Sequence, residues 1–369
     1  MTVESGERRR WLQAAAGAAL WPLVDAPVQA QQGSLPIADM HSHFGIIRRT
    51  LASAELGAEM RSHHVALLAW KMVADSPWLR RGPRGIDVVG TPEQGKLAAR
   101  FDTQIARMKS YLREQRLKIV LSPADVDACV APGGTSGVVL AAEGAHFLEG
   151  DVGRLPAARD KGLRHLQLVH FVPSPVGDNQ TLAPVHRGLS AMGKQLVESC
   201  NEQRVLIDLA HASMDCVEQA LQISKTPLVW SHGWVDRVAG RWLDATTHLQ
   251  RRLSIAHAKM IADKGGVIGL WAGALLKPGP AWAAGRGSWT VGVHDTEGYA
   301  REIANLVDKL GADHVAFGTD MEGLGDQWAV DDYAGVRTVL DQLQTLKLSS
   351  DAIEHVAFRN YARVLKAAL

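Results

Sequence analysis

Short apolar runs alternate with amphipathic segments along most of this chain. Eight of the runs are rich in Val, Ile and Leu, and their nearly continuous apolar character is typical of parallel strands that are buried on both faces. These predicted strands cover residues 37–43, 65–70, 138–143, 163–170, 205–211, 228–232, 267–271 and 315–320.

Helical patterns separate these runs. Helices are predicted over residues 92–115, 189–202, 214–223, 255–264 and 296–310, and a short extra apolar run covers residues 119–121. The pairs Lys161-Gly162 and Gly265-Gly266 precede two of the strands and indicate helix C-caps. Regular alternation of strand and helix with right-handed connections predicts an α/β fold, a (β/α)₈ TIM-type barrel. A doubly wound open sheet is the alternative.

The N-terminal residues do not follow this pattern. Arg8-Arg9-Arg10 precedes the apolar stretch 14–24, and the small-residue sequence Val28-Gln29-Ala30 follows it. This order resembles a cleaved twin-arginine export signal over residues 1–30, which leaves 31–369 as a single domain. The apolar stretch is too short for a membrane span, so we expect a periplasmic or secreted protein without a stable membrane anchor.

Composition narrows the classes of function. The 369 residues are 46% hydrophobic and 21% charged, and the net charge of +1 gives no electrostatic reason to expect nucleic acid as a partner. The 3 cysteines show no CxxC spacing. Any metal ion would therefore be bound by histidines and carboxylates rather than by thiolates.

Histidines and carboxylates stand at the ends of six of the eight predicted strands. Because side chains alternate along a strand, the two histidines of the first run point the same way. The C-terminal ends of barrel strands form the active-site face. In chain order, this face would carry His41 and His43, Glu143, His170, His211, His232 and Asp320. A single histidine or carboxylate at such a place is ordinary, whereas this series predicts a metal site.

The donor set indicates the number of ions. One tetrahedral catalytic ion keeps about three protein ligands. The candidate donors exceed this number, since they comprise four histidines (His41, His43, His211 and His232), Glu143 and Asp320. They suit two divalent ions that share a bridging carboxylate, with zinc as the expected metal. Such a pair polarises a carbonyl oxygen and lowers the pKa of a bound water from about 15.7 towards about 7. Hydrolysis of an amide or related bond by an activated hydroxide is the expected chemistry.

Several motifs resemble those of the membrane dipeptidase family (renal dipeptidase, peptidase M19), within the wider amidohydrolase-type metal barrels. The resemblance runs from about residue 37 to the C-terminus. It rests on residues 142–146 (AEGAH), 162–170 (GLRHLQLVH), 206–213 (LIDLAHAS), 227–232 (PLVWSH), 251–254 (RRLS), 265–269 (GGVIG) and 317–323 (FGTDMEG). It implies a binuclear metallo-dipeptidase that acts on small dipeptides, including those with a D-residue on the C-terminal side.

The resemblance also implies roles for individual residues. Glu143 matches the bridging glutamate, His211 and His232 match the ligands of one metal, and His41 with the residue two positions later matches those of the other. Asp320 matches an aspartate near the metals that handles protons. His170 matches a histidine that stabilises the substrate oxyanion. Arg251 matches an arginine that binds the terminal carboxylate of the substrate. Asp178-Asn179 matches a loop motif of the family, which either lines the substrate pocket or forms an Asx turn.

The chain departs from the family pattern at two places. The first motif of the family is commonly His-x-Asp, whereas here it is His41-x-His43, so a neutral ligand replaces an anionic one. Nineteen positions separate His232 from Arg251, and the residues between them contain Arg241 as a second candidate for binding the carboxylate.

Three readings of the function follow. The first is a dipeptidase, and the second is a metal-dependent hydrolase of another small amide, a lactam or an ester. The third is a metal- or peptide-binding protein without catalysis, which Asp320 and His170 disfavour because binding alone needs neither a proton shuttle nor an oxyanion donor. The sequence leaves the oligomeric state open, including a homodimer.

The two arginines can be distinguished by kinetics. If Arg251 binds the free carboxylate, Arg251→Met raises the KM for dipeptides and hardly changes the KM for C-terminally amidated analogues, because these lack the charge that Arg251 would contact. The Arg241→Met variant is the matched control. The same phenotype in Arg241→Met alone would assign the carboxylate to Arg241.

Overall fold

Eight parallel strands close into a ring within the part of the chain that the structure describes. The structure is a computed structural model and describes residues 35–47, 51, 54–82, 85–235, 252–276, 289–323 and 327–369. The strands follow one another around the ring in chain order. They are β1 (Ile37–Ser42), β2 (Val65–Val73), β6 (Gly137–Glu143), β7 (Leu163–Gln167), β8 (Leu206–Asp208), β9 (Val229–Trp230), β12 (Val267–Leu270) and β15 (Val315–Phe317).

Two pairings show that the sheet is closed. β15 pairs with β1, which joins the last strand of the ring to the first, and β2 pairs with β6 from Leu67↔Gly137 to Val73↔Glu143. Each of the eight predicted runs overlaps one of these strands. The predicted (β/α)₈ barrel is therefore confirmed and the open sheet is wrong. The extra run at 119–121 begins at the last residue of β5 (Lys118–Ile119), a strand that pairs with β6 outside the ring.

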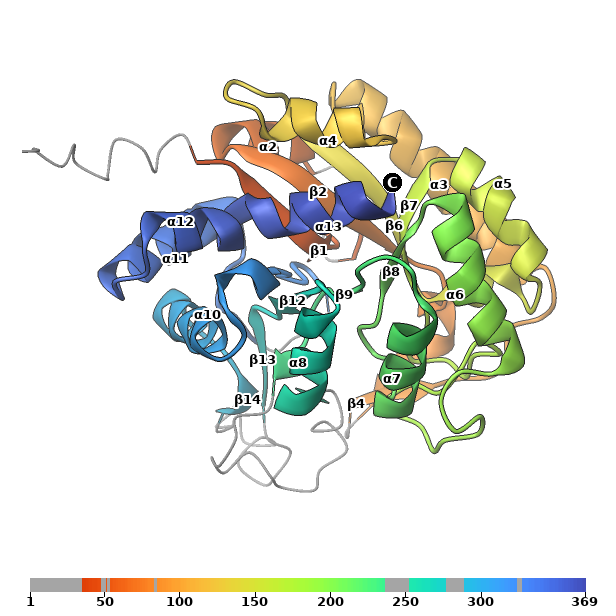
Figure 1. Cartoon of the computed structure of the whole chain (residues 1–369). Coiled ribbons are helices and arrows are strands. Elements are labelled where there is room, and N and C mark those ends of the chain that lie inside the picture. Colours follow the sequence, from red (N-terminus) through yellow and green to blue (C-terminus); the bar gives the residue numbers. More distant parts are fainter. Residues whose placement is uncertain are drawn as a thin grey trace, which may run out of the picture. The chain divides into compact units, whose positions relative to one another are not determined.

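Helices surround the ring (Figure 1). The five predicted helices are present as α3 (Lys96–Glu114), α6 (Ala191–Gln203), α7 (Met214–Ile223), α8 (Ile255–Asp263) and α10 (Thr296–Leu310). The last four are preceded by the N-cap residues Ser190, Ser213, Ser254 and Asp295. The side chain of each N-cap accepts a backbone N–H of the first helical turn. These caps explain why the predicted starts lie close to the observed ones.

Within the described residues, six further helices lie outside the predicted ones. Three lie between early strands, and three follow the last strand, beyond the last predicted pair of strand and helix. They are α2 (Leu56–Ser62), α4 (Pro123–Val130), α5 (Leu155–Asp160), α11 (Tyr333–Thr345), α12 (Ser350–Glu354) and α13 (Asn360–Ala368), with a π-helical turn at His355–Arg359 between the last two.

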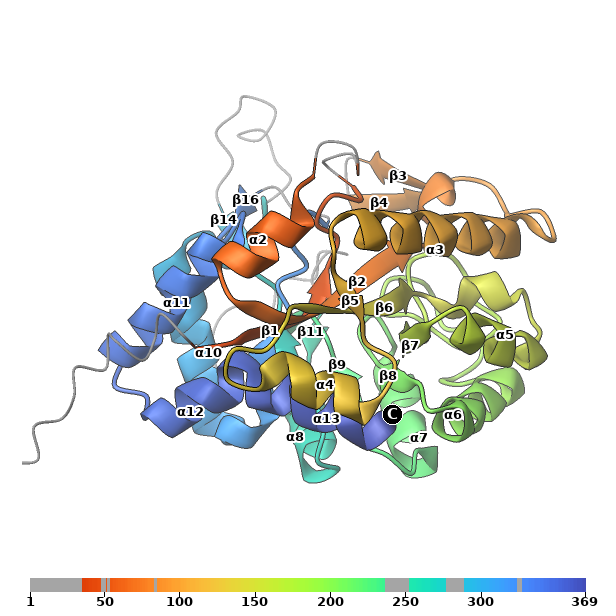
Figure 2. The same ribbon diagram turned by 90° about the horizontal axis from the view of Figure 1, so that it is seen from above.

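Helix α13 closes the N-terminal end of the barrel. Tyr361 and Leu365 pack in one apolar cluster with the first residues of several strands, such as Leu206 and Val267. Short strands follow the C-terminal ends of the barrel strands, namely β3 (Leu79–Gly82), β4 (Gly85–Val88), β10 (Trp234–Val235), β11 (Arg252–Leu253), β13 (Gly273–Leu276), β14 (Trp289–Gly292) and β16 (Gln327–Trp328). Figure 2 shows α13 and α4 on the opposite side of the barrel from β3, β4, β14 and β16. Among the described helices, none has the length and apolar character needed to cross a bilayer.

A buried ion pair lies among the barrel strands. Lys71 Nζ of β2 donates to Asp208 Oδ2 of β8 over 2.6 Å, and both side chains are fully buried. Burial alone would raise the pKa of Asp208, but the positive charge of Lys71 holds it well below the usual value. His165 Nε2 lies 3.4 Å from the same carboxylate oxygen, and burial lowers the pKa of His165 to about 4. Asp208 is therefore ionised and is compensated mainly by Lys71.

Removing Lys71 should destabilise the fold. Lys71→Met leaves the Asp208 carboxylate buried without its cation, so we expect the free energy of unfolding to fall by about 3 kcal/mol at pH 7. The folded-state pKa of Asp208 is lowered, so its contribution is complete above the unfolded-state pKa of about 4 and is lost as the pH falls through the folded-state pKa. The difference between the two proteins should therefore shrink in acid.

Denaturant unfolding at fixed metal concentration measures this effect. Lys161→Met, which removes an exposed partner of Asp102, is the matched control and should leave stability unchanged. Equal stability of Lys71→Met and the unaltered protein at pH 7 would contradict the role given to the ion pair.

Candidate metal centre

The seven residues predicted at the strand ends lie close together and are buried. Each follows or ends its strand on the C-terminal side of the barrel, and none exposes more than 7% of its surface. His41 and His43 point the same way, as the alternation of side chains predicts, with their Nε2 atoms 3.1 Å apart. The barrel therefore brings residues 279 positions apart in the chain, from His41 to Asp320, into one cluster.

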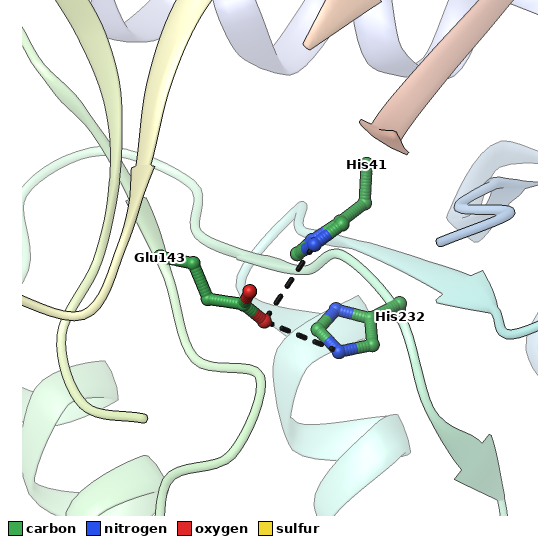
Figure 3. A group of neighbouring side chains, drawn as sticks. All are labelled: His41, Glu143 and His232. Carbon is green, nitrogen blue, oxygen red and sulfur yellow. Dashed lines mark ion pairs between the residues drawn. The ribbon is translucent and has the colours of Figure 1, made fainter. Parts of the chain in front are cut away.

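Glu143 lies at the centre of this cluster. Its Oε2 atom is 3.2 Å from Nε2 of His43, and its Oε1 atom is 3.3 Å from Nε2 of His211 and 3.4 Å from Nε2 of His170. Figure 3 shows His41 and His232 directed at Oε1 from β1 and from the end of β9, at 3.6 and 3.7 Å. One carboxylate thus faces five imidazoles, four at Oε1 and one at Oε2, and such a central carboxylate could be shared by two ions.

The distances between donor atoms suit metal ions. Two ligands that each lie about 2.0–2.1 Å from a tetrahedral ion are roughly 3.3 Å apart. Nε2 of His211 and Nε2 of His232 are 3.1 Å apart, and Oδ1 of Asp320 lies 3.2 Å from His43 and 3.5 Å from His41. Three triplets have their donor atoms within 4.8 Å of one another: His41, Glu143 and His232; His41, His43 and Asp320; and Glu143, His170 and His211.

Hydrogen bonds on the far side of the rings orient the ligands. Nδ1 of His43 lies 2.9 Å from the carbonyl oxygen of Lys71, which can only accept, so Nδ1 carries the hydrogen and Nε2 is the atom that could bind a metal. The Oγ atom of Ser231 lies 2.9 Å from Nδ1 of His41 and 3.2 Å from Nδ1 of His232. One hydroxyl group therefore supports two of the predicted ligands.

The electrostatics of the cluster favour a bound cation. Burial acts to raise the pKa of Glu143, but the histidines around it, His170 and His41 first, hold it well below the usual value. Burial also acts to lower the pKa of His43, yet hydrogen bonds to Asp320 and Glu143 raise it to about 10. The carboxylates thus stabilise positive charge at His43, a role that a metal ion takes over when it displaces the proton.

Two of the site residues have strained backbones. His211 has φ of 67° and Asp320 has φ of 53°, in the left-handed region that side chains other than glycine seldom adopt. Such conformations cost roughly 1–3 kcal/mol each and are concentrated at functional sites. Both residues turn sharply at the end of a strand, which directs their side chains to the centre of the barrel mouth.

The predicted substrate-binding residues have mixed outcomes. Asp178 accepts backbone N–H groups of Val185, His186 and Gly188, so its carboxylate orders a loop. Asn179 accepts from the backbone of Thr181 and residue 182 in an Asx-type turn. A direct contact of either residue with substrate stays a prediction. Arg251 and Arg241 lie outside the described residues.

Three contributing residues were missed. Asp75 bonds to His170, Lys71 supplies the carbonyl group for His43, and Ser231 supports His41 and His232. Asp75 lies two residues beyond the end of β2, at the same end of the barrel as the predicted ligands. A predicted second strand that reached Val73 would have included it among the strand-end residues. The predicted second strand stopped at residue 70, whereas β2 continues to Val73.

The comparison with protein families agrees with this geometry. Residues 32–369 match the model described as membrane dipeptidase, peptidase family M19. The chain belongs to the membrane dipeptidase family. The predicted resemblance to this family is confirmed.

Individual relatives of this family member are distant. A dipeptidase, tcpJ, of Claviceps purpurea is 23% identical over 62% of this chain and 50% of its own length, so the match spans half of that relative. An uncharacterized protein of Klebsiella pneumoniae is 26% identical over 71% of this chain and 94% of its own. A metallopeptidase of Rhodobacter sphaeroides with a phosphinate mimic of the dipeptide L-Ala-D-Ala has a TM-score of 0.70 and 21% identity over 91% of this chain and all of its own. This structural likeness shows a shared fold.

A glycine beside Asp320 offers a test of that carboxylate. A Cβ atom at Gly323 would overlap the carboxylate group of Asp320, which can move aside because it ends a flexible side chain. Gly323→Ala should therefore fold and bind metal normally but lower kcat by about 100-fold, since small displacements of reacting groups have costs of this order. Asp320→Asn should lower kcat by a similar or larger factor.

Steady-state kinetics and metal analysis measure these effects. Gly298→Ala on α10 is the matched control, because a Cβ atom there lies at 3.1 Å from the Asp295 carboxylate and should leave kcat unchanged. An unchanged kcat in Gly323→Ala would show that the position of the Asp320 carboxylate does not limit turnover.

Proposed function

We propose that this protein is a binuclear metal-dependent dipeptidase that hydrolyses small dipeptides, including those with a D-residue on the C-terminal side. The observation that carries the proposal is the central position of Glu143, whose Oε1 atom lies 3.3–3.7 Å from Nε2 of His41, His211 and His232 and whose Oε2 atom lies 3.2 Å from Nε2 of His43. A single tetrahedral ion, which keeps about three protein ligands, would leave part of this donor set unused. Membership of the membrane dipeptidase family supports the peptide bond as the bond that is cleaved.

The predicted ligands divide between two divalent ions, for which we propose zinc. His41 and His43 would hold one ion, His211 and His232 the other, and Glu143 both. When bound, the ions supply Lewis acidity, which polarises a carbonyl oxygen and acidifies water. A donor set of imidazole nitrogens and carboxylate oxygens suits zinc and related divalent metals.

Asp320 would handle the proton of the attacking water. Its Oδ1 atom lies 3.2–3.5 Å from the Nε2 atoms of His41 and His43, beside the predicted ligands and within the reach of a water between them. A carboxylate at this place can accept a proton and then donate it to the leaving amine. This transfer completes hydrolysis without a covalent enzyme intermediate.

His170 would stabilise the negative charge that develops on the carbonyl oxygen. Its Nε2 atom lies at the mouth of the same cluster, 3.4 Å from Oε1 of Glu143. Because Nδ1 carries the hydrogen that is bonded to Asp75, Nε2 would donate to the substrate carbonyl oxygen in the doubly protonated ring. A fixed donor at this point acts in a water-poor environment, where such stabilisation contributes most. Arg251 would bind the terminal carboxylate of the dipeptide.

Substrate chirality and location extend the proposal. The structural relative of Rhodobacter sphaeroides binds a mimic of L-Ala-D-Ala, which supports the inclusion of D-residues. The twin-arginine signal predicted over residues 1–30 lies outside the described residues and supports action in the periplasm or after secretion. Dipeptides outside the cytoplasm are the substrates that this combination favours.

Metal removal and reconstitution test the proposal. Complete chelation should abolish hydrolysis of L,L- and L,D-dipeptides, and zinc, manganese or cobalt should restore it, with two ions per chain at full activity. Elemental analysis and a panel that also contains lactams and simple esters provide the readout. His257→Ala, on the outer helix α8, is the control and should retain both ions.

Either of two results would reject the proposed function. Turnover that persists after complete metal removal rejects the mechanism. Hydrolysis of the lactams or esters without hydrolysis of any dipeptide assigns the protein to the alternative class of small-amide and ester hydrolases.

A further inference from the structure

We propose that Asp75 is a positioning residue that holds the His170 ring with its Nε2 atom towards the metal centre, which makes Asp75 and His170 a functional pair. Oδ1 of Asp75 lies 2.8 Å from Nδ1 of His170, and both side chains are buried. The inference rests on the proposed function, in which His170 acts on the substrate.

The contacts of Asp75 determine the orientation of the ring. An ionised carboxylate can only accept, so Nδ1 of His170 carries the hydrogen of this bond. Rotation of the ring by a half turn would place a carbon atom against Asp75 and turn Nε2 away from Glu143. The hydrogen bond therefore selects the one ring orientation in which Nε2 lies 3.4 Å from Oε1 of Glu143.

Asp75 also holds the backbone that carries His170. Its Oδ2 atom accepts the backbone N–H of Val172 over 3.3 Å. The carbonyl oxygen of Val172 is in turn 2.9 Å from Nε2 of His146, the histidine that follows Glu143 in the turn after β6. The two oxygens of Asp75 thus restrain both the side chain of His170 and the loop after β7.

Neighbouring rings limit the remaining freedom of His170. The ring of Phe171 packs against it edge to face with 4.6 Å between centroids, and the ring of His211 lies at 4.5 Å. These contacts restrict where the ring lies, but they are nearly indifferent to which nitrogen faces the metal centre. Asp75 supplies that discrimination, as carboxylates do for histidines at metal sites.

A kinetic double-mutant cycle tests the pair. Asp75→Ala should lower kcat for a dipeptide by about 10- to 100-fold and change KM by less than about threefold, with metal content unchanged. His170→Ala should lower kcat at least as far. The double variant should be no slower than His170→Ala, because a residue that acts through His170 has no effect once His170 is absent.

Conservative variants separate positioning from a general structural role. Asp75→Asn keeps an oxygen acceptor for Nδ1–H and should stay within about fivefold of the unaltered kcat. Asp75→Ser, which is polar but too short to reach Nδ1, replaces Asp75→Ala if the alanine variant does not fold. Glu218→Ala is the matched control, because it removes a carboxylate 3.0 Å from His257 on the outer helices and should leave kcat unchanged.

A spectroscopic readout makes the test independent of turnover. The downfield proton resonance of the His170 Nδ1–H group should be present in the unaltered protein and in Asp75→Asn, and absent from Asp75→Ala and His170→Ala. If the metal-loaded protein cleaves no dipeptide but this pattern is seen, the proposed function fails while the positioning of His170 stands.

Three results would overturn the inference. One is an unaltered kcat in both Asp75→Ala and Asp75→Ser. Another is a double variant in which the two losses multiply, which would show that Asp75 acts independently of His170. The third is a His170 Nδ1–H resonance that persists in Asp75→Ala.

Discussion

The buried carboxylate of Glu143 is the constraint on which the rest of the site depends. An ionised carboxylate that is removed from water is destabilised by several kcal/mol unless positive charge or hydrogen bonds surround it. Here the imidazoles of His41, His43, His211 and His232 approach its two oxygens from the ends of three different strands, β1, β8 and β9. Such compensation from all sides is available only at the mouth of a closed barrel, where many strand ends converge on one point.

The closed ring also explains why the polar groups below the site are tolerated. Lys71 and Asp208 lie on β2 and β8, and each is stable in the interior only because the other is present. Both residues also form hydrogen bonds to groups of the predicted metal site. The carbonyl group of Lys71 binds Nδ1 of His43, and Oδ1 of Asp208 accepts the N–H group of Ser231, next to His232. Stability of the barrel and orientation of the predicted ligands are therefore coupled.

The strained backbone and the close packing of the site both occur where the chain turns sharply at the ends of the strands. His211 and Asp320 adopt left-handed conformations, and Gly323 leaves room for the Asp320 carboxylate. Each of these features lowers the stability of the fold or restricts which residue the position accepts. A turn at the surface would not require either. The many contacts of the barrel core offset these costs, which keeps the reactive groups in place before any substrate binds.

The sequence by itself determined the barrel and most of its metal centre. Strand runs have a short-range apolar pattern, and the strand-end rule then selects His41, Glu143, His232 and Asp320 without further information. The prediction was wrong at Lys71. The predicted second run ends before this charged residue, whereas β2 continues to Val73. Asp75, which lies two residues beyond the end of β2, was therefore missed.

Only the tertiary structure decided those two positions. A buried lysine is acceptable because Asp208 faces it from another strand, and Asp75 acquires a role because His170 lies beside it. Both are contacts between residues about 95 or more positions apart. A local pattern records the polarity of a residue but not the partner that makes its burial favourable.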